Sequence, residues 1–308
     1  MTLPRLVALP VSLTLKSSSL QGDGVDIRGH GILLEDLIID GAFRNGISVI
    51  EAEDLLVRNC VVKNTIGQDP EAGVDIEPDP LMVTEDFARF KLTNIRFENV
   101  QFIDNFGGGI TLSIGMMNDT HNPISIVFDN CTVNGTGNTP EALLGLSARA
   151  RLRGAEPDAV AVGGHNHGCA APGTIEFRGL RVSNARGGAG INVESKRATG
   201  AKILFQDTVV EGVSHPTRVD PYINSSLAPI NVFSTRVPWH HLCRPETYPG
   251  EPSGAPPPPA EPHGQLEKVG GVHFNRVTVK DQSYRPFAKF IDPVSRIDLS
   301  GSGLSLVR

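Results

Sequence analysis

The chain has 308 residues, of which 20% are charged and only 6% are aromatic, and it contains 33 glycines and 23 prolines. This composition is typical of many short strands joined by turns rather than of long helices. The formal net charge of −6 argues against nucleic acid as the main partner, and no run of 18 apolar residues predicts a membrane-spanning helix.

The first predicted element is a short strand near the N-terminus. Apolar and polar residues alternate from Val11 to Lys16, which is the period of a half-buried strand. The apolar stretch around these residues also resembles the centre of a signal peptide. No small-residue cleavage site follows it, so we favour the strand.

From residue 32 onwards one unit recurs: an alternating strand, a polar turn residue and a second alternating strand. Eight copies begin at Ile32, Leu55, Ile95, Ile126, Ile175, Ile203, Val272 and, with a looser fit, Ile297. A further short strand, usually introduced by glycine, follows each of the first seven copies and begins at residues 46, 73, 109, 160, 190, 229 and 288. Such strands bury their apolar side only when successive turns stack into one continuous core. The sequence therefore predicts a single all-β domain over residues 1–308, a parallel β-helix solenoid of about eight rungs.

Two columns fix the register of the repeat. Asn or Asp occupies the turn position in five copies, at Asp36, Asn59, Asn99, Asn130 and Asp207. The next position is predicted to point inward and is held by Leu37, Cys60, Val100, Cys131, Leu180, Thr208 and Val277.

The four cysteines form no CxxC pair and no regular framework, which argues against both a zinc ribbon and a disulfide-stapled domain. Cys60 and Cys131 would lie two rungs apart, about 9 to 10 Å, which is too far for a disulfide. We expect both to fill the core as small apolar side chains.

Candidate catalytic residues lie in the strand that starts at Gly73. If Val74 and Ile76 point inward, Asp75 and Glu77 project outward about 6.6 Å apart, a separation suited to an acid and a base placed across a glycosidic bond. Asp79 follows in the adjoining loop. The same three acids also suit Ca²⁺, whereas a solvated polar face without chemistry is the simpler interpretation.

The equivalent outward positions of other strands, together with the loops that leave these strands, supply candidate substrate-binding residues. Small hydroxyl and amide groups on a flat sheet suit sugars, histidine and cations suit proton abstraction or uronate neutralisation, and the only tryptophan suits stacking on a sugar ring. This set comprises Thr111, His165, Asn192, Glu194, Lys196, Arg197, Asn231 and Trp239. His165, His167 and Cys169 also resemble a transition-metal set, but no fourth ligand is fixed by spacing, so we expect no metal there. Trp239 lies in a Pro-rich inserted loop, residues 234–270, which we expect to be extended.

The repeat resembles the pectate-lyase-like superfamily, which includes polysaccharide lyases, pectin-type glycoside hydrolases and uronan epimerases. The resemblance covers roughly residues 20 to 305 and implies a right-handed parallel β-helix. Sub-family motifs do not match: Gly29-His30-Gly31 stands without the other pectin-hydrolase motifs, and the sequence around Asp75 only distantly resembles the epimerase motif. No catalytic residue is carried over from these families.

These patterns favour a carbohydrate-active protein that cleaves a polysaccharide along one outer face, with hydrolysis slightly preferred over β-elimination. The alternatives are a non-catalytic carbohydrate-binding or adhesion β-helix and a purely structural rod. No cofactor is required, although Ca²⁺ is compatible, and the expected partner is a glycan rather than nucleic acid or a membrane. Neither terminus offers a capping helix, so we expect an oligomer, an additional capping segment or a longer protein. The fold analogy alone suggests a secreted or cell-surface location.

Overall fold

The computed structural model describes residues 13–16, 22–78, 90–114, 117, 122–137, 158–163, 172–186, 188–194, 201–213, 219–220, 225–226, 229–233, 272–280, 288–291, 297–298 and 304–307. These residues form an all-β structure with two large sheets, and every strand pair in the two large sheets is parallel. A small antiparallel pair joins β18 (Val219–Asp220) to β19 (Ser225–Ser226). The all-β, parallel character predicted from the repeat is therefore confirmed.

The first large sheet has nine strands, which stack in the order of the chain. They are β1 (Leu13–Lys16), β3 (Leu37–Asp40), β5 (Val61–Lys63), β8 (Gln101–Ile103), β11 (Thr132–Asn134), β14 (Arg181–Ser183), β17 (Val209–Glu211), β22 (Val277–Lys280) and β25 (Leu304–Val307). β1 confirms the strand expected near the N-terminus.

The second large sheet has 14 strands and divides into two branches that meet at the long strands β2 (Val25–Glu35) and β4 (Ile47–Arg58). The first branch holds β6 (Ala72–Ile76), β9 (Gly108–Ser113), β12 (Val160–Gly163), β15 (Ile191–Glu194), β20 (Ile230–Phe233) and β23 (Ala288–Ile291). The second branch holds β7 (Leu92–Glu98), β10 (Ile124–Asp129), β13 (Gly173–Arg178), β16 (Ala201–Gln206), β21 (Val272–Asn275) and β24 (Ile297–Asp298).

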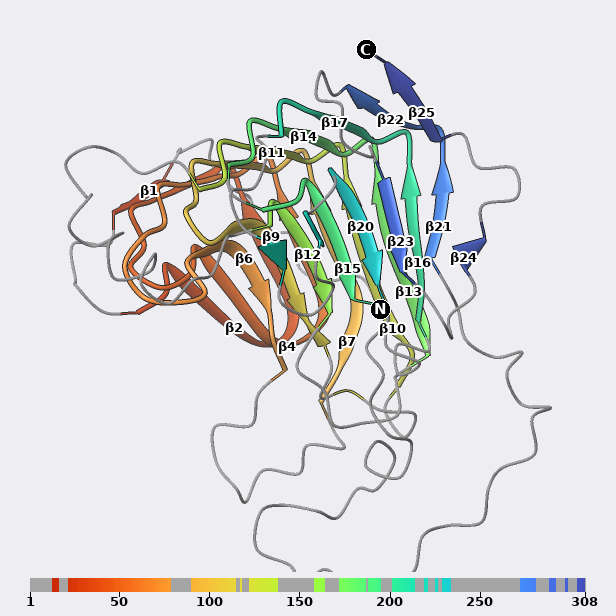
Figure 1. Ribbon diagram of the computed structural model, residues 1–308. Helices are drawn as coiled ribbons and strands as arrows, with labels where there is room; N and C mark the ends of the chain where they lie inside the picture. The colour runs from red at the N-terminus through yellow and green to blue at the C-terminus, as the bar shows by residue number, and fades with distance from the viewer. Residues whose placement is uncertain are drawn as a thin grey trace, which may run out of the picture.

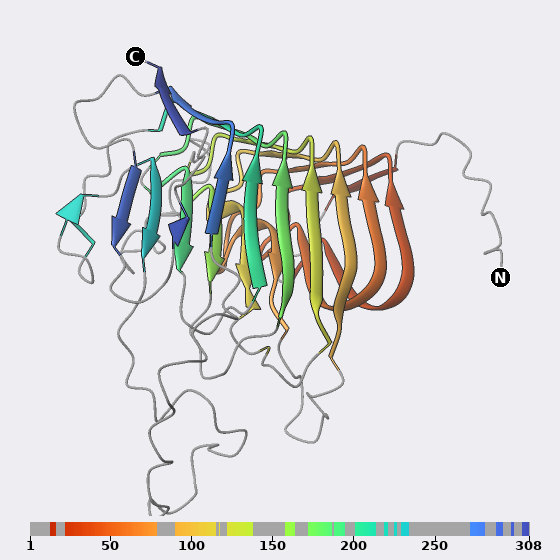
Figure 2. The ribbon, with the colours of Figure 1, turned by 90° about the vertical axis from the view of Figure 1, so that its right-hand side faces the viewer.

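The chain passes through the first branch, the second branch and the nine-stranded sheet in turn, and then repeats the cycle. We call one passage through these three parts a coil. Strands β9, β10 and β11 make one coil, and β12, β13 and β14 make the next. Figure 1 looks into the curled cross-section, and Figure 2 shows the strands of successive coils side by side. The arrangement is consistent with the solenoid predicted from the repeat.

A phenylalanine stack holds five coils together. Phe97, Phe128, Phe177, Phe205 and Phe274 occupy one inward register of the second branch. Successive ring centroids lie 4.7, 5.2, 4.6 and 5.4 Å apart with nearly parallel planes. Each ring packs on the ring of the next coil because parallel strands repeat at about the thickness of an aromatic contact.

The backbone conformation explains why Asn or Asp recurs at the turn position of the repeat. Asn59, Asn99 and Asn130 all adopt φ between 52° and 54°, in the left-handed region that Asn tolerates better than most residues. The following inward positions are buried, including Cys60 and Cys131, and both of these thiols are free. The inward column and the core role of the two cysteines are therefore confirmed.

Glycine introduces many first-branch strands because neighbouring coils approach closely there. A Cβ on Gly46 would lie 2.1 Å from the Val62 side chain and 2.6 Å from the carbonyl oxygen of Gly73. A Cβ on Gly73 would meet the carbonyl oxygen of Gly109 at 2.7 Å. Contacts this short exclude a side chain, so glycine lets the first branch fold back onto the nine-stranded sheet.

Candidate functional site

The first branch brings the predicted outward residues into one column, in the register expected from the sequence. Strand pairing aligns Ser48 with Asp75, Asp75 with Thr111, and so on through Ala161, Asn192 and Asn231. We call Ser48, Asp75, Thr111, Ala161, Asn192 and Asn231 the polar column. The column places one side chain per coil on the outer side of the first branch.

Parts of the polar column are shielded from solvent, contrary to the expectation from simple alternation. Ser48, Asp75 and Asn231 are only 2%, 1% and 1% exposed, whereas Thr111 and Asn192 are half-buried. Strand alternation predicts the side of the sheet on which a side chain lies, but it contains no information about what covers that side. A buried polar side chain needs partners, so the contacts of the column decide its role.

A recurring hydrogen-bonded clamp joins consecutive coils beside the polar column. The Asp23 carboxylate accepts hydrogen bonds from the Asn45 backbone N–H (3.0 Å) and the Ser48 hydroxyl (2.8 Å). Further along the stack, the Asp158 carboxylate before β12 makes the same pair of contacts with the coil that follows it, accepting from the Ala189 N–H (2.6 Å) and the Asn192 amide (2.5 Å).

Asn45 makes a third clamp with the donor and acceptor roles partly reversed. Its side-chain oxygen accepts from the Ala72 backbone N–H (3.1 Å), while its amide nitrogen donates to Asp75 Oδ2 (3.3 Å) and to the Ser48 hydroxyl (3.0 Å). An amide in this place requires an acceptor opposite, and a carboxyl group at position 75 meets that need. The clamp was missed from the sequence, although Asp23, Asn45 and Asp158 all stand two residues before the first inward residue of their strands.

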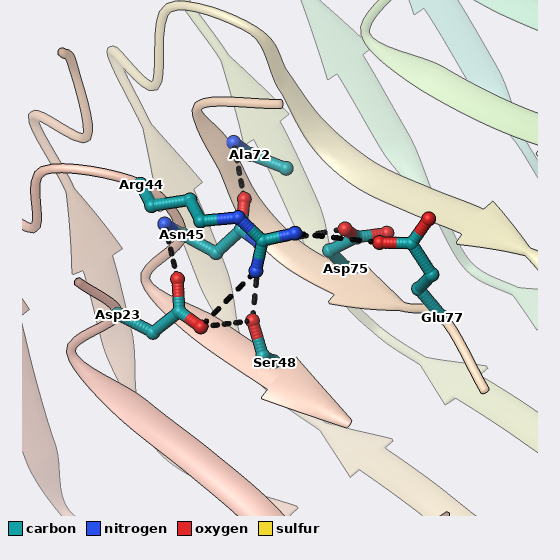
Figure 3. A network of polar contacts seen from close by, with 7 residues as sticks. All are labelled: Asp23, Arg44, Asn45, Ser48, Ala72, Asp75 and Glu77. Carbon is teal, nitrogen blue, oxygen red and sulfur yellow. Dashed lines mark hydrogen bonds and ion pairs between the residues drawn. The ribbon is translucent and has the colours of Figure 1, made fainter. Parts of the chain in front are cut away.

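Arg44 connects the clamp to the predicted catalytic pair. Its guanidinium lies 3.3 Å from Asp23 Oδ2 and 3.4 Å from Glu77 Oε2. Figure 3 shows the four charged side chains converging, with Arg44 between Asp23 on one side and Asp75 and Glu77 on the other. We call Asp23, Arg44, Asp75 and Glu77 the Arg44 cluster. No repeat or motif in the sequence points to Arg44, which lies in a bend between β3 and β4.

The buried carboxyl group of Asp75 retains its proton far above the ordinary range. Burial, the largest cause, together with the negative charge of Glu77 and a hydrogen bond to Glu77, raises its pKa to about 8. Arg44 and Asn45 oppose this shift. Asp75 Oδ1 has no other hydrogen-bond partner. The Glu77 side chain is 38% exposed, so a proton held between the two groups reaches solvent through Glu77.

The remaining predicted residues fall on one edge of the first branch or in the connections that leave it. Glu194 ends β15, but its side chain is not described. Asp79, His165, Lys196, Arg197 and Trp239, together with the Pro-rich loop 234–270, lie outside the described residues. The connections that contain them run from β6 to β7, from β12 to β13, from β15 to β16 and from β20 to β21. These connections therefore all leave the same edge of the first branch.

Comparisons with protein-family models, with curated proteins and with solved structures find no match for this chain. Its function therefore has to be inferred from geometry. Within the described ranges, no three His, Cys, Asp or Glu side chains are arranged as metal ligands. Because Asp79 lies outside those ranges, a Ca²⁺ site stays a prediction. The described part of the chain also has no helix that is long and apolar enough to cross a membrane.

Proposed function

We propose that this chain is a right-handed parallel β-helix of about eight rungs, similar to the pectate-lyase-like superfamily, and that it binds and cleaves a polysaccharide on the outer side of the first branch. Hydrolysis is preferred over β-elimination. Elimination needs a cation to neutralise a uronate carboxylate, and Arg44 is already engaged by Asp23 and Glu77. No cofactor is required, and Ca²⁺ remains compatible with the acids of this region.

The Asp75 and Glu77 pair is the observation that carries the proposal. One carboxyl group is buried with a pKa of about 8, and its neighbour is partly exposed. Two interacting carboxyl groups with unlike environments keep one proton available at neutral pH, which is what a general acid needs. Glu77 is the group that transfers this proton to the glycosidic oxygen as the bond to the anomeric carbon breaks, and Asp75 is the buried group that keeps it supplied. A water molecule adds to the anomeric carbon, and the proton that this water releases returns to the acid pair.

The polar column and the adjoining connections form the rest of the proposed site. Thr111, Asn192 and Asn231 line the sugar subsites together with Glu194. His165, Lys196, Arg197 and Trp239, from the connections that follow β12, β15 and β20 in the chain, complete the proposed set, and Asp79 follows the acid pair in the sequence as a supporting carboxylate. A glycan chain running across the coils would then contact one polar side chain per strand, at a spacing of about 4.8 Å.

Polysaccharide hydrolysis tests the proposal directly. Incubation with a panel of polysaccharides, with and without Ca²⁺, should release new reducing ends without the ultraviolet absorbance of an unsaturated product. Glu77→Gln should lower the rate about 100-fold or more, because it removes the group that transfers the proton. Glu211→Gln is the matched control, since Glu211 lies on the nine-stranded sheet and pairs with Lys280. Unchanged cleavage by Glu77→Gln would refute the assigned role.

A non-catalytic carbohydrate-binding or adhesion role is the second candidate. It is favoured by the clamp, because Asp75 occupies the same position as Ser48 and Asn192 and makes an equivalent structural contact. In that case no product forms on any polysaccharide, and glycan binding measured by calorimetry survives both Asp75→Asn and Glu77→Gln.

A further inference from the structure

The charges around the acid pair bear on which glycan the site accepts. The Arg44 cluster surrounds one guanidinium with the carboxyl groups of Asp23, Asp75 and Glu77. Its net charge is negative whether or not Asp75 carries a proton. The guanidinium is also occupied on both sides, within 3.3 and 3.4 Å of two carboxylates. Within the described part of the chain, a carboxylate on a sugar at the acid pair would therefore meet like charge, and the cation beside that pair, Arg44, is already bound by two carboxylates.

The hydrogen-bonding groups of the polar column also favour an uncharged glycan. Its six residues from Ser48 to Asn231 carry no positive charge, and the same register reaches a lysine, Lys289, only on the next strand, β23. One of its buried oxygen atoms, Asn192 Oδ1, has no hydrogen-bond partner among the described residues. The Asn192 amide nitrogen is already committed to Asp158 Oδ2, so only the acceptor oxygen remains. A sugar hydroxyl donates to such an oxygen, whereas a carboxylate, which only accepts, cannot.

The spacing between the acid pair, Asp75 and Glu77, and Asn192 suits a polymer rather than a single sugar. Asp75 lies on β6 and Asn192 on β15, three strand spacings further along the first branch. Three spacings correspond to about 14 Å. Thr111 lies between them with a half-buried hydroxyl that both donates and accepts.

We infer that the site selects an uncharged glycan chain and rejects chains that carry carboxylates, because the Arg44 cluster repels a uronate and Asn192 of the polar column offers an acceptor oxygen that a hydroxyl group satisfies and a carboxylate does not. This inference rests on the proposed function and adds the substrate class to it. It separates the chain from uronate-specific proteins of the fold that it resembles.

The test compares one oligosaccharide in two charge states. Galacturonan oligomers of equal length are prepared fully methyl-esterified, which makes them neutral, and as the free uronate. Binding of both to the full chain is measured by calorimetry at low ionic strength and in 0.5 M NaCl. We expect the neutral form to bind about tenfold more tightly or better at low salt, and this preference to shrink in high salt.

Two variants test whether the negative charge of the Arg44 cluster causes the preference for the neutral oligomer. Glu77→Gln removes one negative charge of the Arg44 cluster and should bring the two affinities closer together. Glu211→Gln, on the other sheet, should leave the preference as it is in the wild type. Equal or tighter binding of the free uronate by the wild type would overturn the inference while leaving a glycan-binding function intact. No binding of either form, nor of neutral glucans and mannans, would overturn both.

Discussion

At the scale of single residues, Asp75 combines a structural and a chemical property. The residue accepts a hydrogen bond from Asn45 as part of the clamp. Because Asp75 is buried, its pKa is raised to about 8 and the carboxyl group stays protonated at lower pH. The native state thus binds a proton that the unfolded chain releases near the ordinary pKa of 3.8. The stabilisation that this proton represents is fully present below pH 3.8 and is lost as pH rises through about 8.

Because the native state binds one proton more than the unfolded chain over this pH range, raising the pH should lower the stability. Between pH 4 and pH 8 the free energy of unfolding of the wild type should fall relative to that of Asp75→Asn, with a slope of at most about 1.4 kcal/mol per pH unit. Asparagine retains the acceptor for Asn45 and has no proton to lose. Urea denaturation at several pH values measures the slope.

Asp207→Asn is a control for which the pH dependence of stability should have the opposite direction. Arg276 lowers the pKa of Asp207, so this residue stabilises the fold above its unfolded pKa and ceases to do so as the solution is acidified. A wild type and an Asp75→Asn variant with parallel pH profiles between pH 4 and pH 8 would contradict the assignment of the buried proton to Asp75.

At the scale of elements, the phenylalanine stack joins five successive coils of the second branch. Phe177 lies between Phe128 and Phe205, with ring centroids 5.2 and 4.6 Å away, and its side chain is completely buried. The stack arises because strands β7, β10, β13, β16 and β21 each place phenylalanine at the same inward position.

Truncation of this side chain should be costly. Phe177→Ala should lower the free energy of unfolding by about 3 to 5 kcal/mol, because it removes a large apolar side chain and leaves a cavity between two rings. Denaturant titration measures the loss. Leu33→Ala serves as the comparison: Leu33 is 49% exposed, so we expect a change within about 0.5 kcal/mol. Similar effects of the two substitutions would mean that the rings do not support each other.

At the scale of the whole molecule, the described strands of the two large sheets form a one-dimensional stack and pair with those of the adjacent coils. Val57 pairs with Phe97 at one end of the second-branch core, whereas Phe274 pairs with Phe205 near the other end. Coils that share no contacts should contribute independently to stability.

Double-mutant cycles distinguish near from distant coils. Phe177→Leu combined with Phe205→Leu should show a coupling of about 0.5 to 1.5 kcal/mol, because these rings are in contact. Val57→Ala combined with Phe274→Leu should be additive within about 0.5 kcal/mol, because several coils separate the two sites. Denaturation midpoints and slopes of the single and double variants give both values. Strong coupling in the distant pair would indicate cooperativity that nearest-neighbour stacking does not explain.

The sequence by itself determined the repeat and the register. The inward positions, the Asn and Asp turns, the core cysteines and the alignment of Ser48, Asp75 and Thr111 follow from periodicity, because a strand period of two and a parallel stack place equivalent residues over one another. The location of the candidate acids on the outer side of the first branch was predicted in the same way.

Only the tertiary structure decided what surrounds those acids. Burial of Asp75, the clamps made by Asp23, Asn45 and Asp158, and the placement of Arg44 between Asp23 and Glu77 all depend on contacts between residues 21 to 34 positions apart. Local periodicity contains no information about such contacts, since they arise from the close approach of turns in neighbouring coils. For the same reason the raised pKa of Asp75 is a property of the folded stack, because burial rather than residue type is its largest cause.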